Sequence, residues 1–204
     1  MTGAGAVDLV LATANPDKAR EISEILGPQV RLLPRPPGAP EVDETGTTLL
    51  GNARLKADAI ARIAGAASVA DDTGLEVDAL GGAPGVWSAR YAGPDASYAD
   101  NVAKLIAALD GVPPERRSAR FRTVALARWP DGGEVVGEGV VEGRISLTAR
   151  GAGGFGYDPV FEPSEGDGRT FAEMEPAAKH RISHRGRAFT ALAARLREAP
   201  GGKS

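Results

Sequence analysis

The chain has 204 residues, enough for one good-sized domain or two small ones with a core and a cleft. Its 42% hydrophobic and 25% charged residues are typical of a globular protein and exclude a disordered, collagen-like or coiled-coil chain. The formal charge of -3 argues against binding to a nucleic-acid polymer, and the lack of cysteine excludes disulfides, thiol nucleophiles and cysteine-ligated metals.

The N-terminal residues lack the pattern of a signal peptide. No positive charge precedes the first apolar stretch, and Asp8 interrupts it. No apolar run in the sequence approaches the roughly 18 residues of a membrane span. We therefore expect a cytoplasmic protein with no membrane partner.

Short apolar runs and amphipathic runs alternate along the first half of the chain. Runs of β-branched and aliphatic residues predict buried strands, whereas an apolar stripe that ends at Gly or Pro predicts a helix. The elements predicted in this half are a strand over 7–12, a helix over 17–26, a loop over 34–46, a helix over 48–64, and strand pieces over 68–70 and 75–77.

The second half predicts a hairpin and two further helices. Two β-rich runs are separated by Pro130-Asp131-Gly132-Gly133, which is typical of a hairpin turn. The elements predicted here are a loop over 79–97, a helix over 98–109, strands over 119–129 and 134–145, a glycine cluster over 151–156, a helix over 187–198 and a frayed tail over 200–204. This order indicates an α/β fold with a mixed sheet flanked by helices. Because there is no repeat and no linker, we expect a single domain over 1–204.

The turn between the first predicted strand and helix, Thr13-Ala14-Asn15-Pro16-Asp17-Lys18, is a candidate phosphate site. Backbone N–H groups at a helix N-terminus attract anions, and Lys18 adds a cation in the first turn. The alternative is a surface turn with a solvated lysine, because the glycine and lysine spacing of a P-loop is absent.

Acidic residues gather in two segments, Glu41 to Glu44 and Asp71-Asp72. Carboxylates from two segments suit Mg²⁺, which takes one or two of them together with substrate phosphates and waters. Because the adjacent Asp71 and Asp72 repel each other, one of them is also a candidate base for activating water. The alternative for acids in loops, which we hold for Glu41, is that they are solvated.

Asp72-Thr73-Gly74 also fits the signature of aspartic proteases. That chemistry needs two carboxylates that share a proton. This chain has one copy of the signature, so only a symmetric dimer could supply the second carboxylate. The single copy disfavours this interpretation.

The glycine cluster Gly151 to Gly156 matches the spacing G-x-G-x-x-G, but a dinucleotide-binding motif requires a helix next. A proline and β-rich residues follow instead and exclude that motif. Two interpretations remain for Phe155 within the cluster: a ring that stacks on a flat ligand, or a core residue of a hairpin-like turn.

A basic segment from Lys179 to Arg187 contains both histidines of the chain. If Ser183 caps a helix there, His184 and Arg185 become donors near its N-terminus, suited to a phosphate or a purine carbonyl. The alternative is a solvated basic run, which we hold for Arg181 and Arg187.

Together and in this order, these segments resemble the inosine-triphosphate pyrophosphatase family, which hydrolyses noncanonical purine nucleoside triphosphates to the monophosphate and pyrophosphate. The segments that carry the resemblance are LATANPDK (11–18), ETGTTLLGNARLKA (44–57), ADDTGLEVDALGGAPGVWSARYAG (70–93), GAGGFGYDPVF (151–161) and KHRISHRG (179–186). These blocks span nearly the whole chain and are specific as a set. Ala14 stands where relatives often have Gly, and Trp87 where they often have another aromatic or aliphatic residue.

The resemblance implies roles for individual residues. Asp72 is implied as the base that accepts a proton from the attacking water and, with Glu44, as a ligand of Mg²⁺. The residues implied to bind the triphosphate or otherwise contact the substrate are Thr13, Ala14, Asn15, Pro16, Asp17, Lys18, Lys56 and Thr73. The residues implied to form the base and substrate pocket are Phe155, Gly156, Tyr157, Asp158, Lys179, His184 and Arg185.

The resemblance also implies an elongated mixed sheet with two lobes, an active site in the cleft between them, and a homodimer. The expected partners are purine nucleoside triphosphates such as dITP, ITP and XTP. Because His184 and Arg185 are donors, they favour an acceptor at purine position 6 over the amino group of adenine. Two other functions remain open: a nucleotide-binding regulator without catalysis, and a dimeric aspartic protease.

Overall fold

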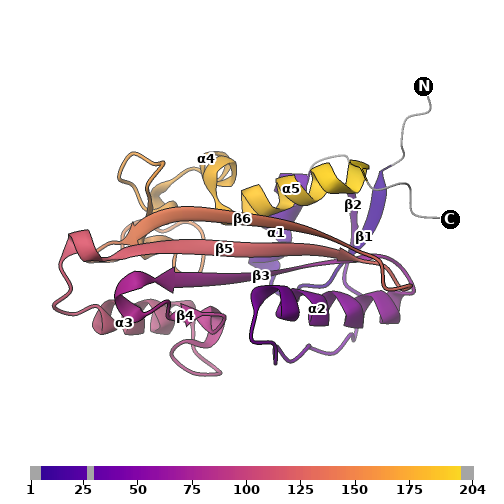
Figure 1. Ribbon diagram of the computed structural model, residues 1–204, viewed down its shortest axis with the longest axis horizontal. Coiled ribbons are helices and arrows are strands. Elements are labelled where there is room, and N and C mark those ends of the chain that lie inside the picture. Colours follow the sequence, from indigo (N-terminus) through magenta and orange to yellow (C-terminus); the bar gives the residue numbers. More distant parts are fainter. Residues whose placement is uncertain (1–5, 27–29, 199–204) are drawn as a thin grey trace. The chain divides into compact units, whose positions relative to one another are not determined.

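A mixed sheet of seven strands runs through the computed structural model, which describes residues 6–26 and 30–198 (Figure 1). The strands are β1 (Val7–Leu11), β2 (Val30–Leu33), β3 (Ser68–Val77), β4 (Pro84–Gly85), β5 (Ser118–Arg128), β6 (Glu134–Ile145) and β7 (Phe161–Pro163). Their hydrogen-bonded order is β2-β1-β3-β5-β6-β7, with β4 beside β3. β1 is parallel to β2 and β3, whereas β4 and β7 run antiparallel to their partners.

Helices flank the sheet, as the sequence predicts. Those in the described residues are α1 (Pro16–Leu26), α2 (Leu49–Ala64), α3 (Tyr98–Ala108), α4 (Pro176–Ile182) and α5 (His184–Glu198). The predicted α/β class with a mixed, helix-flanked sheet is confirmed. None of the described helices combines the length and the apolar character needed to cross a membrane.

The chain divides into two compact units, each assembled from separate segments. Unit 1 comprises Met1–Asp72, Thr123–Gly139 and Arg185–Ser204, and unit 2 comprises Thr73–Arg122 and Val140–His184. The boundaries fall within β3, β5 and β6, so these three strands contribute residues to both units. The single domain over 1–204, with two lobes and a cleft, stays a prediction.

In unit 1, alternate strand residues face two different layers of helices. Leu9 of β1 packs in a cluster with residues of α1 and α5, whereas the next residue, Val10, packs in a cluster with residues of α2. Val69 and Ala70 of β3 divide in the same way. This is the two-residue period of a strand that is buried on both faces. Figure 1 shows the result, with α2 on one side of these strands and α1 and α5 on the other.

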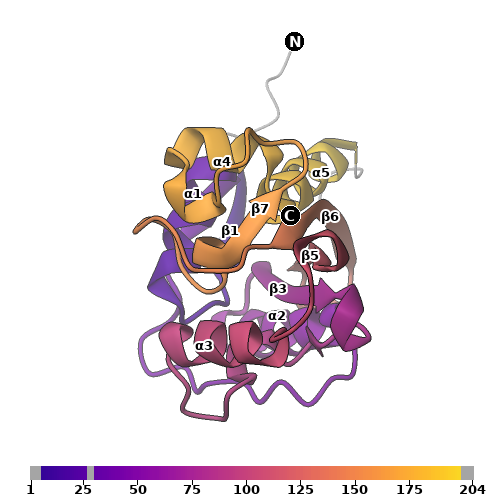
Figure 2. The same cartoon turned by 90° about the vertical axis from the view of Figure 1, so that its left-hand side faces the viewer.

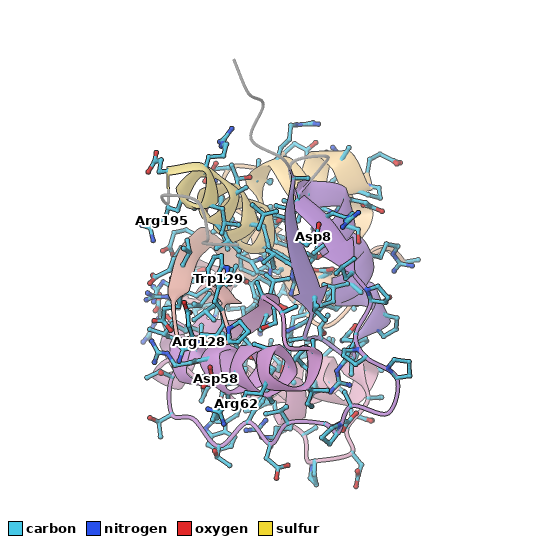
Figure 3. The ribbon with its side chains drawn as sticks, turned by 90° about the vertical axis from the view of Figure 1, so that its right-hand side faces the viewer. Asp8, Asp58, Arg62, Arg128, Trp129 and Arg195 are labelled. Carbon is cyan, nitrogen blue, oxygen red and sulfur yellow. The ribbon has the colours of Figure 1, made fainter. Side chains whose placement is uncertain are left out.

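α2 begins and ends at local signals. Thr48 has extended backbone, and its side chain accepts a hydrogen bond from Gly51 N at 3.0 Å. Gly65 follows the last turn with φ of 60°, a left-handed conformation that glycine adopts without strain. The predicted helix over 48–64 is therefore confirmed. Arg128 at the end of β5 donates to Asp58 of α2 at 2.5 Å, and both residues can be followed in Figure 3.

The core of unit 2 is rich in aromatic rings. Phe121 packs on Phe161 with ring centroids 4.7 Å apart, and Phe161 packs on Phe171 at 5.2 Å. α3 contributes Val102 and Leu105 to the same core. Figure 2 shows α3 on one side of the strands of unit 2 and α4 on the other.

The predicted break between two strand pieces, 68–70 and 75–77, is wrong. β3 runs without interruption from Ser68 to Val77. Adjacent acids are typical of loops, but Asp71 and Asp72 are only 1% and 5% exposed. Both have oppositely charged partners in unit 1, so the segment does not need water to stabilise its charges.

The other predicted boundaries differ less from those of the structure. The last helix begins at His184 rather than at residue 187, so part of the basic segment forms its first turn. Ser183 ends α4 as its C-cap residue and lies directly before α5. The glycine cluster is followed by one short turn of helix, Asp158–Val160, and then by β7, which confirms that it is not a dinucleotide-binding motif. The tail predicted over 200–204 lies outside the described residues.

Candidate functional site

The candidate phosphate turn in unit 1 is organised by its own side chains. Asn15 Oδ1 accepts hydrogen bonds from the backbone N–H groups of Asp17 and Lys18, at 2.9 and 3.2 Å, and so caps α1. Thr13 Oγ1 accepts from Asn15 N at 3.1 Å. These three amides are therefore already hydrogen-bonded. The turn offers an anion mainly the ammonium group of Lys18.

The remaining residues of this turn add no cation that could bind an anion. Asp17 pairs with the exposed Arg20 at 2.7 Å, on the outer side of α1. Pro16 is the first residue of α1, where its fixed φ suits a helix start. Among the described residues only glycines have positive φ, so Ala14 keeps an ordinary backbone conformation although relatives often have Gly there.

Asp71 lies among cations on one face of β3. Its Oδ2 lies 3.3 Å from Lys18 Nζ and 3.3 Å from Arg185 Nε. The guanidinium of Arg185 also donates to Glu21 of α1 at 2.5 Å. Burial alone would raise the pKa of Asp71, but Lys18, Arg185 and Lys56 outweigh it and hold that pKa well below its ordinary value. Asp71 is therefore an ionised carboxylate held in ion pairs with Lys18 and Arg185.

Asp72 has a different set of partners. Its Oδ1 accepts from Lys56 Nζ at 2.8 Å, and its Oδ2 accepts from Asn52 Nδ2 at 3.2 Å. Lys56 also donates to Glu44 Oε1 at 2.7 Å. An ammonium group thus lies between two carboxylates from separate segments of unit 1. These are the two carboxylates that the sequence proposes as metal ligands.

The different partners of Asp71 and Asp72 follow from the strand. Consecutive side chains of a strand point to opposite faces, so Asp71 joins the face covered by α1 and α5, and Asp72 joins the face covered by α2. The two carboxylates therefore have different electrostatic surroundings although they are neighbours in the chain.

The titratable groups around Asp72 respond to burial and charge together. Burial raises the pKa of Asp72 above its ordinary value, although the ammonium groups of Lys56 and Lys18 oppose the shift. Burial lowers the pKa of Lys18, with Asp71 opposing. Burial would also lower the pKa of Lys56, but Asp72 and Glu44 raise it above its ordinary value. A buried carboxylate with a raised pKa suits proton transfer from water.

The donor set fits a hard divalent cation that also binds phosphate. No cluster of three or more His, Cys, Asp or Glu side chains arranged for a metal ion occurs within residues 6–26 and 30–198. Glu44 and Asp72 supply two carboxylates that already hold a cation, the ammonium of Lys56, between them. Mg²⁺ commonly takes one or two carboxylates and completes its shell with waters and substrate phosphates. Two carboxylates are therefore sufficient protein ligands for Mg²⁺.

The glycine cluster in unit 2 is fixed by Asp158. Its Oδ2 accepts from Phe155 N at 2.8 Å and from Lys179 Nζ at 2.7 Å. Gly154 has φ of 67°, and a Cβ there would lie 2.1 Å from the same carboxylate oxygen, so only glycine allows this approach. Lys179 also lies 5.3 Å from the centroid of the Phe155 ring. Asp158 and Lys179 thus position Phe155.

Phe155 itself is only partly buried. Its burial is therefore intermediate between a ring open for stacking and a core residue, the two interpretations that the sequence leaves open. Its ring lies 5.8 Å from that of Tyr98, at the start of α3. Both rings line an open cavity of about 570 Å³ between α3 and the glycine cluster, and Gly156 lines it as well. One side of the ring can therefore meet a ligand.

Two other predicted pocket residues are deep in unit 2. The hydroxyl of Tyr157 donates to Ser88 O at 2.9 Å, and burial raises the pKa of Tyr157 far above its ordinary value. His184 stacks on Phe121 with ring centroids 4.4 Å apart.

Thr73 follows Asp72 on β3 and is partly buried. The chain thus divides the predicted residues between the units: Thr13 to Lys18, Glu44, Lys56, Asp72 and Arg185 belong to unit 1, and the others belong to unit 2.

Two further residues contact the predicted set directly. The sequence gives no role to Glu21, and it places Asn52 on the same helix face as Lys56 while leaving open whether that face is solvent or a site. Glu21 lies three residues after Lys18, on the same face of α1, and binds Arg185. Asn52 lies one turn before Lys56 on α2 and binds Asp72. Helical spacing from a candidate lysine is the signal that could have identified both.

Known proteins resemble this chain over almost its full length. A sequence model described as the Ham1 family matches residues 9–195. A dITP/XTP pyrophosphatase of Methylococcus capsulatus is 50% identical over 198 residues, which cover 95% of this chain and 98% of that protein. A dITP/XTP pyrophosphatase of Geobacillus kaustophilus is 48% identical over 199 residues, which cover 96% and 97%.

Solved structures agree with the sequence comparison. A HAM1 protein from Coxiella burnetii has a TM-score of 0.85 and 38% sequence identity, over 95% of this chain and 100% of that one. Both sequence and fold therefore match across nearly the whole length, and the chain belongs to the Ham1 family.

Proposed function

We propose that this protein hydrolyses noncanonical purine nucleoside triphosphates, such as dITP, ITP and XTP, to the nucleoside monophosphate and pyrophosphate. One observation carries the proposal: a chain that is 50% identical to a dITP/XTP pyrophosphatase has a buried Asp72 with Lys56 and Glu44 beside it. The relatives bearing that name confirm the resemblance to the inosine-triphosphate pyrophosphatase family.

Asp72 is the proposed base. Its raised pKa and its position beside two lysines suit a carboxylate that accepts a proton from water while the water attacks phosphorus. Lys56 and Lys18 offset the negative charge that develops on the phosphoanhydride, and pyrophosphate leaves without a covalent intermediate on the enzyme. Asp71 remains paired with Lys18 and Arg185, which keeps it from competing for this role.

Glu44 and Asp72 would hold Mg²⁺ through their carboxylates. The ion would supply charge neutralisation on the triphosphate and orient it for attack. The ammonium of Lys56, which contacts both carboxylates, would then be available to the phosphates. Metal dependence is thus part of the proposal.

We propose that the purine base is recognised by stacking on an aromatic ring and by hydrogen-bond donors. Phe155, held by Asp158, offers a partly exposed ring for stacking on a purine. His184 and Arg185 are donors, which favours a 6-oxo purine because the amino group of adenine would leave them unpaired. In this structure Glu21 and Asp71 hold the guanidinium of Arg185, which limits the directions in which it can donate.

Neither alternative gains a supporting observation. An aspartic protease needs a second carboxylate to share a proton with Asp72, whereas Asp72 contacts an ammonium group and a carboxamide. A regulator without catalysis has no need for the arrangement of Asp72, Lys56 and Glu44. We further propose a cytoplasmic homodimer that acts on small nucleotides, and light scattering on the purified protein tests the dimer.

The deciding experiment incubates the purified protein with ITP, XTP, dITP, ATP and GTP, with and without Mg²⁺, and quantifies pyrophosphate and orthophosphate separately. We expect metal-dependent release of pyrophosphate from ITP, XTP and dITP, and little from ATP. GTP also carries a 6-oxo group, so its rate relative to ITP tests whether the site rejects a 2-amino group as well. Orthophosphate as the primary product would contradict the proposed cleavage position. Tight nucleotide binding without hydrolysis would favour the regulator.

A further inference from the structure

Asn52 is a fully buried polar residue in the middle of the proposed site. Its exposed fraction is 0%, although it lies on α2 only one turn before Lys56. Burying a carboxamide is unfavourable unless both of its ends form hydrogen bonds. Asn52 satisfies both ends, and each bond leads to a segment that carries a proposed catalytic or metal-binding carboxylate.

The orientation of the carboxamide follows from its partners. Oδ1 accepts from Gly46 N at 2.8 Å, and a backbone N–H can bond only to an acceptor. The NH₂ group must therefore face Asp72, where it donates to Oδ2 at 3.2 Å. Because Lys56 binds the other oxygen of Asp72 at 2.8 Å, the carboxylate is fixed at both of its oxygens.

The second arm of Asn52 fixes the loop that carries Glu44. Gly46 lies two residues after Glu44, and Thr48 of the same loop caps α2. A Cβ on Gly46 would lie 2.6 Å from Asn52 Oδ1, so a larger residue would push the loop and the carboxamide apart. The contacts close a ring, from Asn52 to Asp72, Lys56, Glu44 and back through Gly46.

We propose that Asn52 is a positioning residue for the reaction of the proposed function, on which this inference rests. Its side chain is buried and acts through Asp72 and the Glu44 loop rather than by touching the substrate. By bonding the Asp72 carboxylate and the backbone of the Glu44 loop at once, it keeps the base and the metal ligands together before substrate arrives. Without it, Asp72 and Glu44 would remain in the chain but lose their common arrangement.

The test compares two Asn-to-Asp substitutions in the full-length protein. Asn52→Asp keeps the shape and the acceptor for Gly46, but places a carboxylate oxygen against Asp72 Oδ2. The matched control is Asn101→Asp in α3. Asn101 is also buried, at 2% exposure, and also joins a helix to a loop, but its partners are Ala92 N and Ala89 O. Both substitutions replace a donor by an acceptor. Only in Asn52→Asp does the new oxygen face a carboxylate, that of Asp72, whereas in Asn101→Asp it faces a backbone carbonyl.

We expect Asn52→Asp to lower kcat for ITP by about 10- to 100-fold, as loss of a residue that orients metal ligands does, with a much smaller change in KM. Without nucleotide, magnesium chloride alone should raise the Tm of wild type and of Asn101→Asp, but raise that of Asn52→Asp less. Asn101→Asp should keep kcat within about twofold even where its Tm falls equally.

Gly46→Ala provides an independent variant that reaches the same contact from the loop. It should share the loss of kcat and the smaller magnesium-dependent shift in Tm, which keeps the inference testable where Asn52→Asp does not fold. The positioning role of Asn52 would be overturned if Asn52→Asp had the kcat and the magnesium-dependent shift in Tm of the wild type. Where Asn52→Asp does not fold, the same result in Gly46→Ala would overturn it. Equal losses of kcat in Asn52→Asp and Asn101→Asp would assign Asn52 a purely structural role. Failure of the proposed function appears differently, as wild-type protein that releases no pyrophosphate.

Discussion

Asp71 and Asp72 are adjacent in the chain but face opposite sides of β3, and this separates their roles. Asp71 is surrounded by Lys18 and Arg185, which favour its ionised form, whereas burial raises the pKa of Asp72. One neighbour is therefore suited to permanent ion pairing and the other to taking up a proton.

Substitution Asp72→Asn should abolish turnover and leave nucleotide binding largely intact. The amide is nearly isosteric but cannot accept the proton of the attacking water, and loss of a general base typically costs 10²- to 10⁴-fold. Pyrophosphate release and the Kd for ITP measure the two effects. Asp110→Asn, at an exposed carboxylate, is the control. A near-normal rate in Asp72→Asn would exclude Asp72 as the base.

Substitution Asp71→Asn should instead reduce stability, in a way that depends on pH. The folded-state pKa of Asp71 lies below its ordinary value of 3.8, so its ionised form stabilises the fold above that pH and the contribution is lost as pH falls below it. At pH 7 the free energy of unfolding should fall by about 3 kcal/mol, because a buried ion pair is broken.

Denaturation of wild type and Asp71→Asn between about pH 7 and about pH 2 checks this expectation. The difference between the two should shrink below about pH 4, where the unfolded wild-type chain takes up the proton. Asp110→Asn should show no comparable difference at any pH. A constant gap for Asp71→Asn would mean that packing, rather than charge, stabilises this position.

Arg185→Ala should reduce the preference for ITP over ATP. If the guanidinium donates to a 6-oxo group, the ratio of the two kcat/KM values should fall by at least about tenfold. The exposed Arg197 of the same helix supplies the control, Arg197→Ala. Equal losses for both nucleotides would show that Arg185 acts mainly through its bonds to Glu21 and Asp71.

At the level of elements, the sequence predicts best what depends on nearby residues. α2 could be delimited because its capping residues, Thr48 and Gly65, lie at its own ends. The continuity of β3 could not, because a partner that stabilises Asp71, Arg185, lies 114 residues away along the chain. A pair of acids looks like a loop until its distant partners are known.

The site follows the same rule. Lys18 and the acids of the two segments 41–44 and 71–72 stand out by charge and position, whereas the family resemblance singles out Glu44, Lys56 and Asp72. The structure brings Lys56 into contact with both carboxylates. The spacing of Asn52 to Lys56 shows only that the two share a helix face, and the sequence does not reveal that Asn52 bonds Asp72 and the Glu44 loop, because these partners lie in other segments. The short strands β2, β4 and β7 were missed as well, since they are too short to show a hydrophobic period.

β6 and α5 pack closely in unit 1 because of a glycine. A Cβ on Gly137 would lie 2.3 Å from Ala188 O and 2.5 Å from Leu192 N, and both atoms are backbone. Gly137→Ala should therefore lower the free energy of unfolding by about 2 kcal/mol or more, as overpacking does. Chemical denaturation measures the change. Glu138→Ala, at the exposed next residue, should have little effect. Equal stabilities would show that α5 can shift without penalty.

At the scale of the whole molecule, neither unit is a continuous piece of chain. Unit 1 needs three segments, and its cores combine residues of Met1–Asp72 with residues of β5 and α5. A fragment ending at Asp72 lacks these later segments. It should therefore show no cooperative unfolding transition, because its apolar faces have no partners. Circular dichroism during urea denaturation, with the full chain as control, checks this. A cooperative transition in the fragment would contradict the assignment of its core.

The positions at which the chain passes between units also affect how the protein can evolve. Two of them lie between Asp72 and Thr73 and between His184 and Arg185, so the residues of the proposed phosphate chemistry and most residues of the proposed base pocket belong to different units. Under the proposed function, substitutions confined to 73–122 and 140–184 would change most of the base pocket while Glu44, Lys56 and Asp72 stay unchanged, and Arg185 is the pocket residue that lies in unit 1. Most of the residues proposed to select the purine could in this way change in evolution without a change in the residues proposed for hydrolysis.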